Sequence, residues 1–129
     1  MTAANREDNA AAEQRMARDA LAEARYLLQG GFARAAVVRA YYAVFHAGRG
    51  LLVGQGVQTK THEGLRRMLA LHGVLAGRLS TSDAEIVTRL AYLREASDYA
   101  TDREITGPEA EEAVALAEHF LRATGVTPD

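Results

Sequence analysis

At 129 residues, 25% of them charged and with a formal net charge of −2 at pH 7, the chain has the size of a single domain, which we expect over residues 1–129. The absence of cysteine excludes disulfides, zinc–thiolate sites and thiol catalysis, and it fits the reducing cytoplasm. The polar start of the sequence does not resemble a signal peptide, and no apolar run approaches the ~20 residues of a membrane-spanning helix. We therefore expect a cytoplasmic protein with no membrane partner.

The first two predicted elements are long helices. Few prolines and many Ala, Leu, Arg and Glu residues favour helix over strand. An apolar stripe that includes Met16 recurs at helical steps and stops at Gly30 and Gly31, a pair typical of helix ends. The second helix starts near Phe32 and runs to the glycine-interrupted residues 53–58. The short glycine connection makes the two helices antiparallel neighbours.

Three shorter helices are predicted after these two. Thr61 is a good N-cap for the third helix. Ser82 with Glu85 has the pattern of a capping box for the fourth, and Thr106 with Glu109 has the same pattern for the fifth. We therefore predict an all-α protein, an up-and-down bundle of four to five helices with more than two thirds of its residues helical.

Charge is distributed unevenly along the chain. Residues 25–80 carry eight basic side chains and one acidic one, whereas residues 81–129 carry four basic and eleven acidic ones. A basic middle beside an acidic end indicates either a site for a polyanion or helices that pair charge against charge. The second arrangement is the more common one.

The second predicted helix carries a polar stripe. Arg39 and His46 are seven residues apart, and about 700° of rotation places them within ~20° of each other around the axis. Tyr42 and Arg49 fall on the same side. An unpaired buried arginine costs several kcal/mol, so this stripe must meet a carboxylate, solvent or a second chain. A different stripe is expected in the core: Val38, Tyr41, Phe45 and Leu52.

The fourth predicted helix offers an internal partner for that stripe in the sequence YLREASDYA. Arg94 and Asp98 form an i, i+4 pair, and Tyr99 follows them. Asp98 could hold Arg39 or the imidazole of His46. Such contacts would form either a buried network that sets the register of the helices or a functional site built from the same residues.

Three segments together resemble the HEPN domain (higher eukaryotes and prokaryotes nucleotide-binding), in its small stand-alone prokaryotic branch. They are RAYYAVFHAGRGLL on the second helix, TKTHEGL opening the third and LREASDY on the fourth, in that family's order and spacing. The resemblance implies a bundle of four or five helices, usually a homodimer. It also implies, in many cases, a neighbouring nucleotidyltransferase partner in a toxin–antitoxin or defence system.

Many members of that family are metal-independent ribonucleases with a motif of arginine, four to six residues and histidine. Arg39 and His46 enclose six residues and fit this spacing. Histidine suits the removal of the 2′-hydroxyl proton, and arginine suits the charge of the transition state; Tyr42 or a second copy's His46 would protonate the leaving oxygen. In ribonuclease members, however, the motif usually lies on a later helix, where this chain has LREASDY without a histidine.

His62 and Lys60 form a further candidate at the start of the third helix. His62 is either a capping or interface residue, or it meets a phosphate, because a helix N-terminus beside a cation favours an anion. The four histidines of the chain do not pair at i, i+4 spacing and there is no cysteine. We therefore expect no metal and no cofactor.

These observations predict a HEPN module that dimerises and binds the phosphate of RNA or of a nucleotide, or binds a nucleotidyltransferase. The alternative is a metal-independent endoribonuclease that uses His46 and Arg39, which must then be open to solvent in a cleft. We expect a two-fold homodimer with the second helix near its axis. The side chains expected to bind phosphate or a partner are Arg49, Lys60, His62, Arg94, Asp98 and Tyr99.

Overall fold

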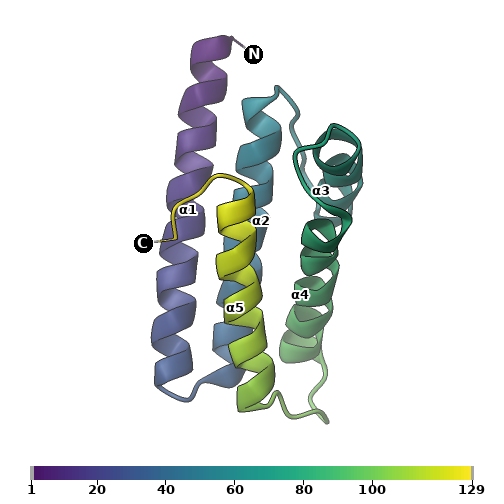
Figure 1. Cartoon of the computed structure of the whole chain (residues 1–129). Coiled ribbons are helices and arrows are strands. Elements are labelled where there is room, and N and C mark those ends of the chain that lie inside the picture. Colours follow the sequence, from purple (N-terminus) through teal and green to yellow (C-terminus); the bar gives the residue numbers. More distant parts are fainter. Residues whose placement is uncertain (1, 129) are drawn as a thin grey trace.

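A computed structural model describes residues 2–128, which form a bundle of helices (Figure 1). Helices make up 77% of the structure, and residues 2–128 contain no strand, which confirms the predicted all-α up-and-down bundle. None of the helices in this range has the length and apolarity needed to cross a membrane. The elements are α1 (Ala3–Gln29), α2 (Ala33–Gly54), α3 (His62–Leu69), the π-helical turn η1 (Ala70–Val74), α4 (Thr81–Tyr99) and α5 (Gly107–Ala123).

The central helix of the bundle is α2. It contacts α1, α3, α4 and α5, and Figure 1 shows α5 in front of it, between α1 and α4. The predicted stop between α1 and α2 is confirmed: Gly31 has a φ of 82°, a left-handed conformation that glycine adopts without strain. Four helices of its own chain contact α2, but Arg39 and Arg49 of its polar stripe stay about one-third exposed, 34% and 33%. A dimer axis near this helix therefore stays a prediction, as does the homodimer itself.

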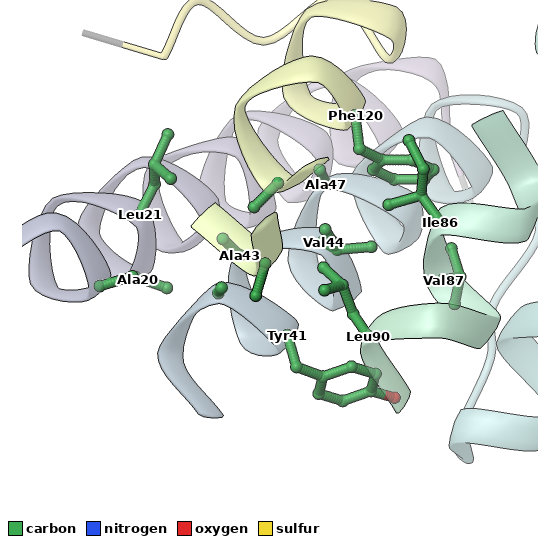
Figure 2. Close-up of a cluster of buried hydrophobic side chains, with 14 of the residues drawn as sticks. Ala20, Leu21, Tyr41, Ala43, Val44, Ala47, Ile86, Val87, Leu90 and Phe120 are labelled. Atoms are coloured by element: carbon green, nitrogen blue, oxygen red, sulfur yellow. The ribbon is translucent and has the colours of Figure 1, made fainter. Parts of the chain in front are cut away.

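The core is built from small side chains on α1 and larger ones on α4 and α5. Figure 2 draws Phe120 of α5 in one cluster with Val44 of α2 and Leu90 of α4. Met16, which the sequence places in the apolar stripe of α1, is instead 49% exposed. The stripe that α1 buries consists of Ala17, Ala20, Leu21 and Ala24. Of the stripe expected in the core from α2, Tyr41 and Leu52 are buried, and Val38 and Phe45 are partly buried.

The helix starts agree with the predicted caps except for α4. Thr61 caps α3, and Thr106 forms a capping box with Glu109 at the start of α5. The capping box of α4 is formed by Ser80 and Asp83, whose reciprocal bonds measure 3.0 and 3.2 Å. The prediction of Ser82 with Glu85 was wrong by two residues. Ser80 has the extended backbone that an N-cap requires, whereas Ser82 lies inside the helix.

Gly48 lets α3 approach α2 closely. A Cβ at this position would lie 3.2 Å from Cδ1 of Leu69 and 3.4 Å from Cδ1 of Leu65, so a larger residue would push these buried side chains outward by a few tenths of an ångström. Leu65 and Leu69 anchor α3 against α2 in this way. His62, the first residue of α3, is consequently held beside α2.

Candidate functional site

The polar stripe of α2 faces carboxylates of α1. Glu13 lies 2.7 Å from Nδ1 of His46 and 3.5 Å from the guanidinium of Arg49, and Glu23 lies 3.1 Å from that of Arg39. The expectation that Asp98 would hold Arg39 or His46 was wrong. Asp98 belongs to α4, which makes no contact with α1 within residues 2–128, and it pairs with a neighbour on its own helix.

This α1–α2 ion-pair group (Glu13, Glu23, Arg39, His46 and Arg49) has the character of a structural network. The side chain of His46 is 16% exposed, and its partner Glu13 is equally covered. A hollow of about 390 Å³ opens nearby, lined in part by Arg49, Lys60 and Glu13, and neither Arg39 nor His46 lines it. The geometry therefore favours charge pairing between helices over an open catalytic pair at these two residues.

On the side of α2 that faces α3 and α4, three helices bring Tyr41, His62 and Arg94 together. The hydroxyl oxygen of Tyr41 lies 2.5 Å from Nδ1 of His62. The guanidinium carbon of Arg94 lies 5.1 Å from the centre of the Tyr41 ring. Figure 2 shows Tyr41 at one end of the core cluster, next to Leu90. His62 of α3 and Arg94 of the LREASDY segment thus contact the same tyrosine of α2.

Asp98 and Tyr99 hold Arg94 from the same helix. Oδ2 of Asp98 lies 3.3 Å from a terminal nitrogen of Arg94, and the phenol of Tyr99 raises the pKa of Arg94. That side chain is only 12% exposed. His62 and Arg94 each contact Tyr41, and Asp98 pairs with Arg94. With the neighbouring Tyr99, we call these residues the Tyr41–His62–Arg94 cluster.

Tyr42 lies between the ion-pair group and the cluster. The guanidinium carbon of Arg39 is 5.5 Å from the centre of its ring. The centre of the Tyr42 ring is also 5.5 Å from that of Tyr41 and 6.3 Å from that of His62. Tyr42 thus contacts Arg39 of the polar stripe on one side and the rings of Tyr41 and His62 on the other.

Arg34 of α2, to which the sequence analysis assigned no role, secures the end of α4. Its guanidinium donates hydrogen bonds to the carbonyls of Ala96, at 3.0 Å, and Ala100, at 3.1 Å, and also to those of Ser97 and Arg103. The last carbonyls of a helix lack partners within it, and a cation there interacts favourably with the helix dipole. Arg34 therefore positions the turn that carries Asp98 and Tyr99.

The surroundings of His62 favour its neutral form. Burial lowers the pKa of His62, and the charges of Arg94 and Arg66 lower it further, whereas Glu95 acts in the opposite direction. Burial raises the pKa of Tyr41 to about 12, despite the same two arginines. At neutral pH both the imidazole and the phenol are consequently uncharged.

The depressed pKa of His62 makes a testable contribution to stability. The unfolded chain binds the proton near pH 6.5, the ordinary value, while the folded chain binds it only at lower pH. The free energy of unfolding therefore decreases as the pH falls from above 6.5, where the unfolded chain binds the proton, toward the lower pKa of the folded chain. We expect the wild type to lose more stability between about pH 7.5 and about pH 5.5 than His62→Asn, which does not titrate but still accepts a hydrogen bond from Tyr41.

Urea unfolding at the two pH values measures this difference. The other histidines are common to both proteins, so their contributions cancel in the comparison. Equal losses in the two proteins would show that His62 is not held in its neutral form.

His46 and His62 both pack against the ring of Phe45, but they form hydrogen bonds with different partners. Within residues 2–128 no three His, Asp or Glu side chains converge on a position that could hold a metal ion. Three of the histidines bond different side chains: His46 bonds Glu13, His62 bonds Tyr41, and His119 bonds Asp83.

A family model of the HEPN domain matches residues 13–126, a range that contains both groups of side chains. The chain belongs to the HEPN domain family. The resemblance seen in the three sequence segments is thereby confirmed, and the Tyr41–His62–Arg94 cluster lies within the HEPN domain.

Relatives of this HEPN domain occur in archaea and bacteria. A protein of Methanocaldococcus jannaschii named "putative toxin" is 36% identical over 106 residues, which cover 82% of this chain and 78% of that protein. A UPF0332 protein of Pyrococcus horikoshii is 38% identical over 68 residues, 53% of this chain and 48% of that protein. A UPF0332 protein of Thermotoga maritima is 28% identical over 110 residues, 85% of this chain and 83% of that protein.

Proposed function

We propose that this HEPN domain binds the phosphate of RNA or of a nucleotide at the Tyr41–His62–Arg94 cluster, as one component of a cytoplasmic toxin–antitoxin or defence pair. The observation that carries the proposal is the position of His62. This histidine of α3 lies against a buried tyrosine of α2 that also contacts an arginine of α4. The relative named as a toxin supports the biological setting.

The distribution of ion pairs supports an anion as the ligand. Within residues 2–128, the arginines of the basic segment that lie on α1 and α2 all have partners. Arg25, Arg39 and Arg49 pair with carboxylates, and Arg34 donates hydrogen bonds to backbone carbonyls. In contrast, no ion pair in this range involves Lys60, Arg66, Arg67 or Arg78. The segment around α3 therefore keeps an uncompensated positive charge, which attracts phosphate.

The shape of the surface near Arg66 suits a ligand larger than phosphate. A hollow of about 430 Å³ lies between α3–η1 and α4, and Arg66 lines it together with Thr81, Thr88, the carboxylate of Glu85 and several apolar side chains. Arg66 also acts electrostatically on His62. A phosphate bound beside Arg66 would thus have room next to it for a nucleoside.

A homodimer and a nucleotidyltransferase partner remain parts of the proposal. Glu13 and Glu23 pair with the polar stripe of α2, but Nε of Arg39 and Nε of Arg49 have no hydrogen-bond partner within residues 2–128, so a second chain near α2 stays part of the proposal. We do not assign nuclease chemistry to Arg39 and His46, since the same carboxylates occupy them. Should the domain cleave RNA, His62 and Arg94 are the side chains that we expect to matter.

Arg66 and Arg67 provide a matched pair for testing the phosphate site. Both are exposed arginines on α3, but Arg66 is the one whose charge acts on both His62 and Tyr41. We expect Arg66→Gln to weaken binding of a fluorescent single-stranded RNA about fivefold to tenfold, and to lower the slope of log affinity against log salt by about 1. Arg67→Gln is expected to change the affinity by less than about twofold.

Fluorescence anisotropy at several salt concentrations measures both effects. Equal losses in the two variants would show that α3 contributes only general positive charge. A larger loss of RNA affinity in His46→Gln than in Arg66→Gln would indicate that RNA binds at the α1–α2 ion-pair group. Absence of binding to RNA and to nucleotides at low salt would refute the proposed function.

A further inference from the structure

The contact between Tyr41 and His62 determines where the proton of the imidazole lies. Tyr41 is 1% exposed, and within residues 2–128 the only partner of its hydroxyl group is Nδ1 of His62, at 2.5 Å. If the hydroxyl oxygen accepted a hydrogen bond from Nδ1–H, its own buried O–H would have no acceptor, which is unfavourable. The Tyr41 hydroxyl must therefore donate, and Nδ1 must accept.

A neutral imidazole that accepts at Nδ1 carries its single proton on Nε2. Nε2 of His62 forms no hydrogen bond within residues 2–128, and it is not a buried atom. The edge of the ring that a ligand can reach is thus a donor. Nε2 carries this single proton when the imidazole is neutral, and burial and the nearby cations favour the neutral imidazole.

The charged groups around His62 also favour a neutral imidazole. The groups that face it are Arg66 from α3 and Arg94 and Glu95 from α4, with the rings of Tyr41 and Tyr42 on α2. Arg66 and Arg94 disfavour a second proton on the ring more than Glu95 favours it, although Arg94 is also paired with Asp98. The same two cations favour an anion in front of Nε2.

We infer that Tyr41 is a positioning residue, which fixes His62 in the Nε2–H tautomer so that His62 donates a hydrogen bond to an oxygen of a bound phosphate group. This inference rests on the proposed function and specifies how the phosphate is recognised. In this tautomer Nε2 cannot take a proton from a 2′-hydroxyl group. The resting site is therefore arranged to bind a phosphate group and not to start RNA cleavage by base catalysis.

Long-range proton–nitrogen NMR correlations of the full-length ¹⁵N-labelled protein test the assignment directly. The spectrum of His62→Asn identifies the signals of His62 among those of the four histidines. In the wild type we expect Nδ1 of His62 to show the shift of an unprotonated ring nitrogen and Nε2 that of a protonated one. Tyr41→Phe removes only the hydroxyl group, and we expect it to shift His62 toward a mixture of the two tautomers.

Addition of inorganic phosphate, and then of a short single-stranded RNA, tests the role of the donor. We expect the Nε2–H signal of His62 to move on titration, and Tyr41→Phe to weaken RNA binding about threefold to tenfold. A protonated Nδ1 in the wild type would overturn the inference, whether or not RNA binds. An Nε2–H tautomer whose signal does not respond to phosphate or RNA would leave the position of the proton established and refute phosphate recognition at this site.

Discussion

Replacement of Phe120 by alanine is expected to lower the free energy of unfolding by about 3–5 kcal/mol, because it leaves a cavity that the surrounding helices cannot fill. Phe120 is fully buried and lies in one cluster with residues of α2 and α4 (Figure 2). Urea unfolding followed by circular dichroism measures the loss.

The aromatic side chain of Tyr26 offers a control for Phe120. It is 78% exposed, so Tyr26→Ala is expected to change the stability by less than about 0.5 kcal/mol. A cost below about 1.5 kcal/mol for Phe120→Ala would mean that α5 packs less closely against the bundle than described.

Arg34→Met is expected to lower the free energy of unfolding by about 2–4 kcal/mol, because the carbonyls at the end of α4 lose a charged donor. Methionine retains much of the length of the side chain but cannot donate a hydrogen bond. The bonds that it removes reach Ala96, Ser97, Ala100 and Arg103. Urea unfolding gives the energy, and amide chemical shifts of Asp98 and Tyr99 report whether the turn moves.

Two further variants separate this role from a general effect of charge. Arg78→Met removes an exposed arginine that forms no ion pair within the described range, and it is expected to cost less than about 0.5 kcal/mol. Arg34→Lys is expected to fall between the wild type and Arg34→Met, since an ammonium group cannot span several carbonyls as the planar guanidinium does. Equal stability of Arg34→Met and the wild type would contradict the assigned contacts.

Helix positions were predictable because the signals that set them are local. The stop at Gly31 and the caps at Thr61 and Thr106 depend on residues within a few positions of each helix end. The error at α4 has the same origin: Ser80 and Ser82 both precede an acidic residue three positions later. Only the backbone conformation around Ser80 decides between them.

The partners of the polar stripe were not predictable in the same way. Periodicity showed that Arg39, His46 and Arg49 share one face of a helix, which is a property of that helix alone. Which carboxylates cover this face depends on which helix packs there. The long α1 lies against it and brings Glu13 and Glu23, whereas the fourth helix packs on the other side of α2.

The sequence by itself determined the helical bundle, most helix ends, membership of the HEPN domain family and the residue types of the candidate site. Only the tertiary structure decided that His62 and Arg94 both contact the buried side chain of Tyr41. The physical reason is that three separate packing contacts create this arrangement. Gly48 admits α3 to the surface of α2, Arg34 holds the end of α4, and burial of Tyr41 leaves its hydroxyl group one partner.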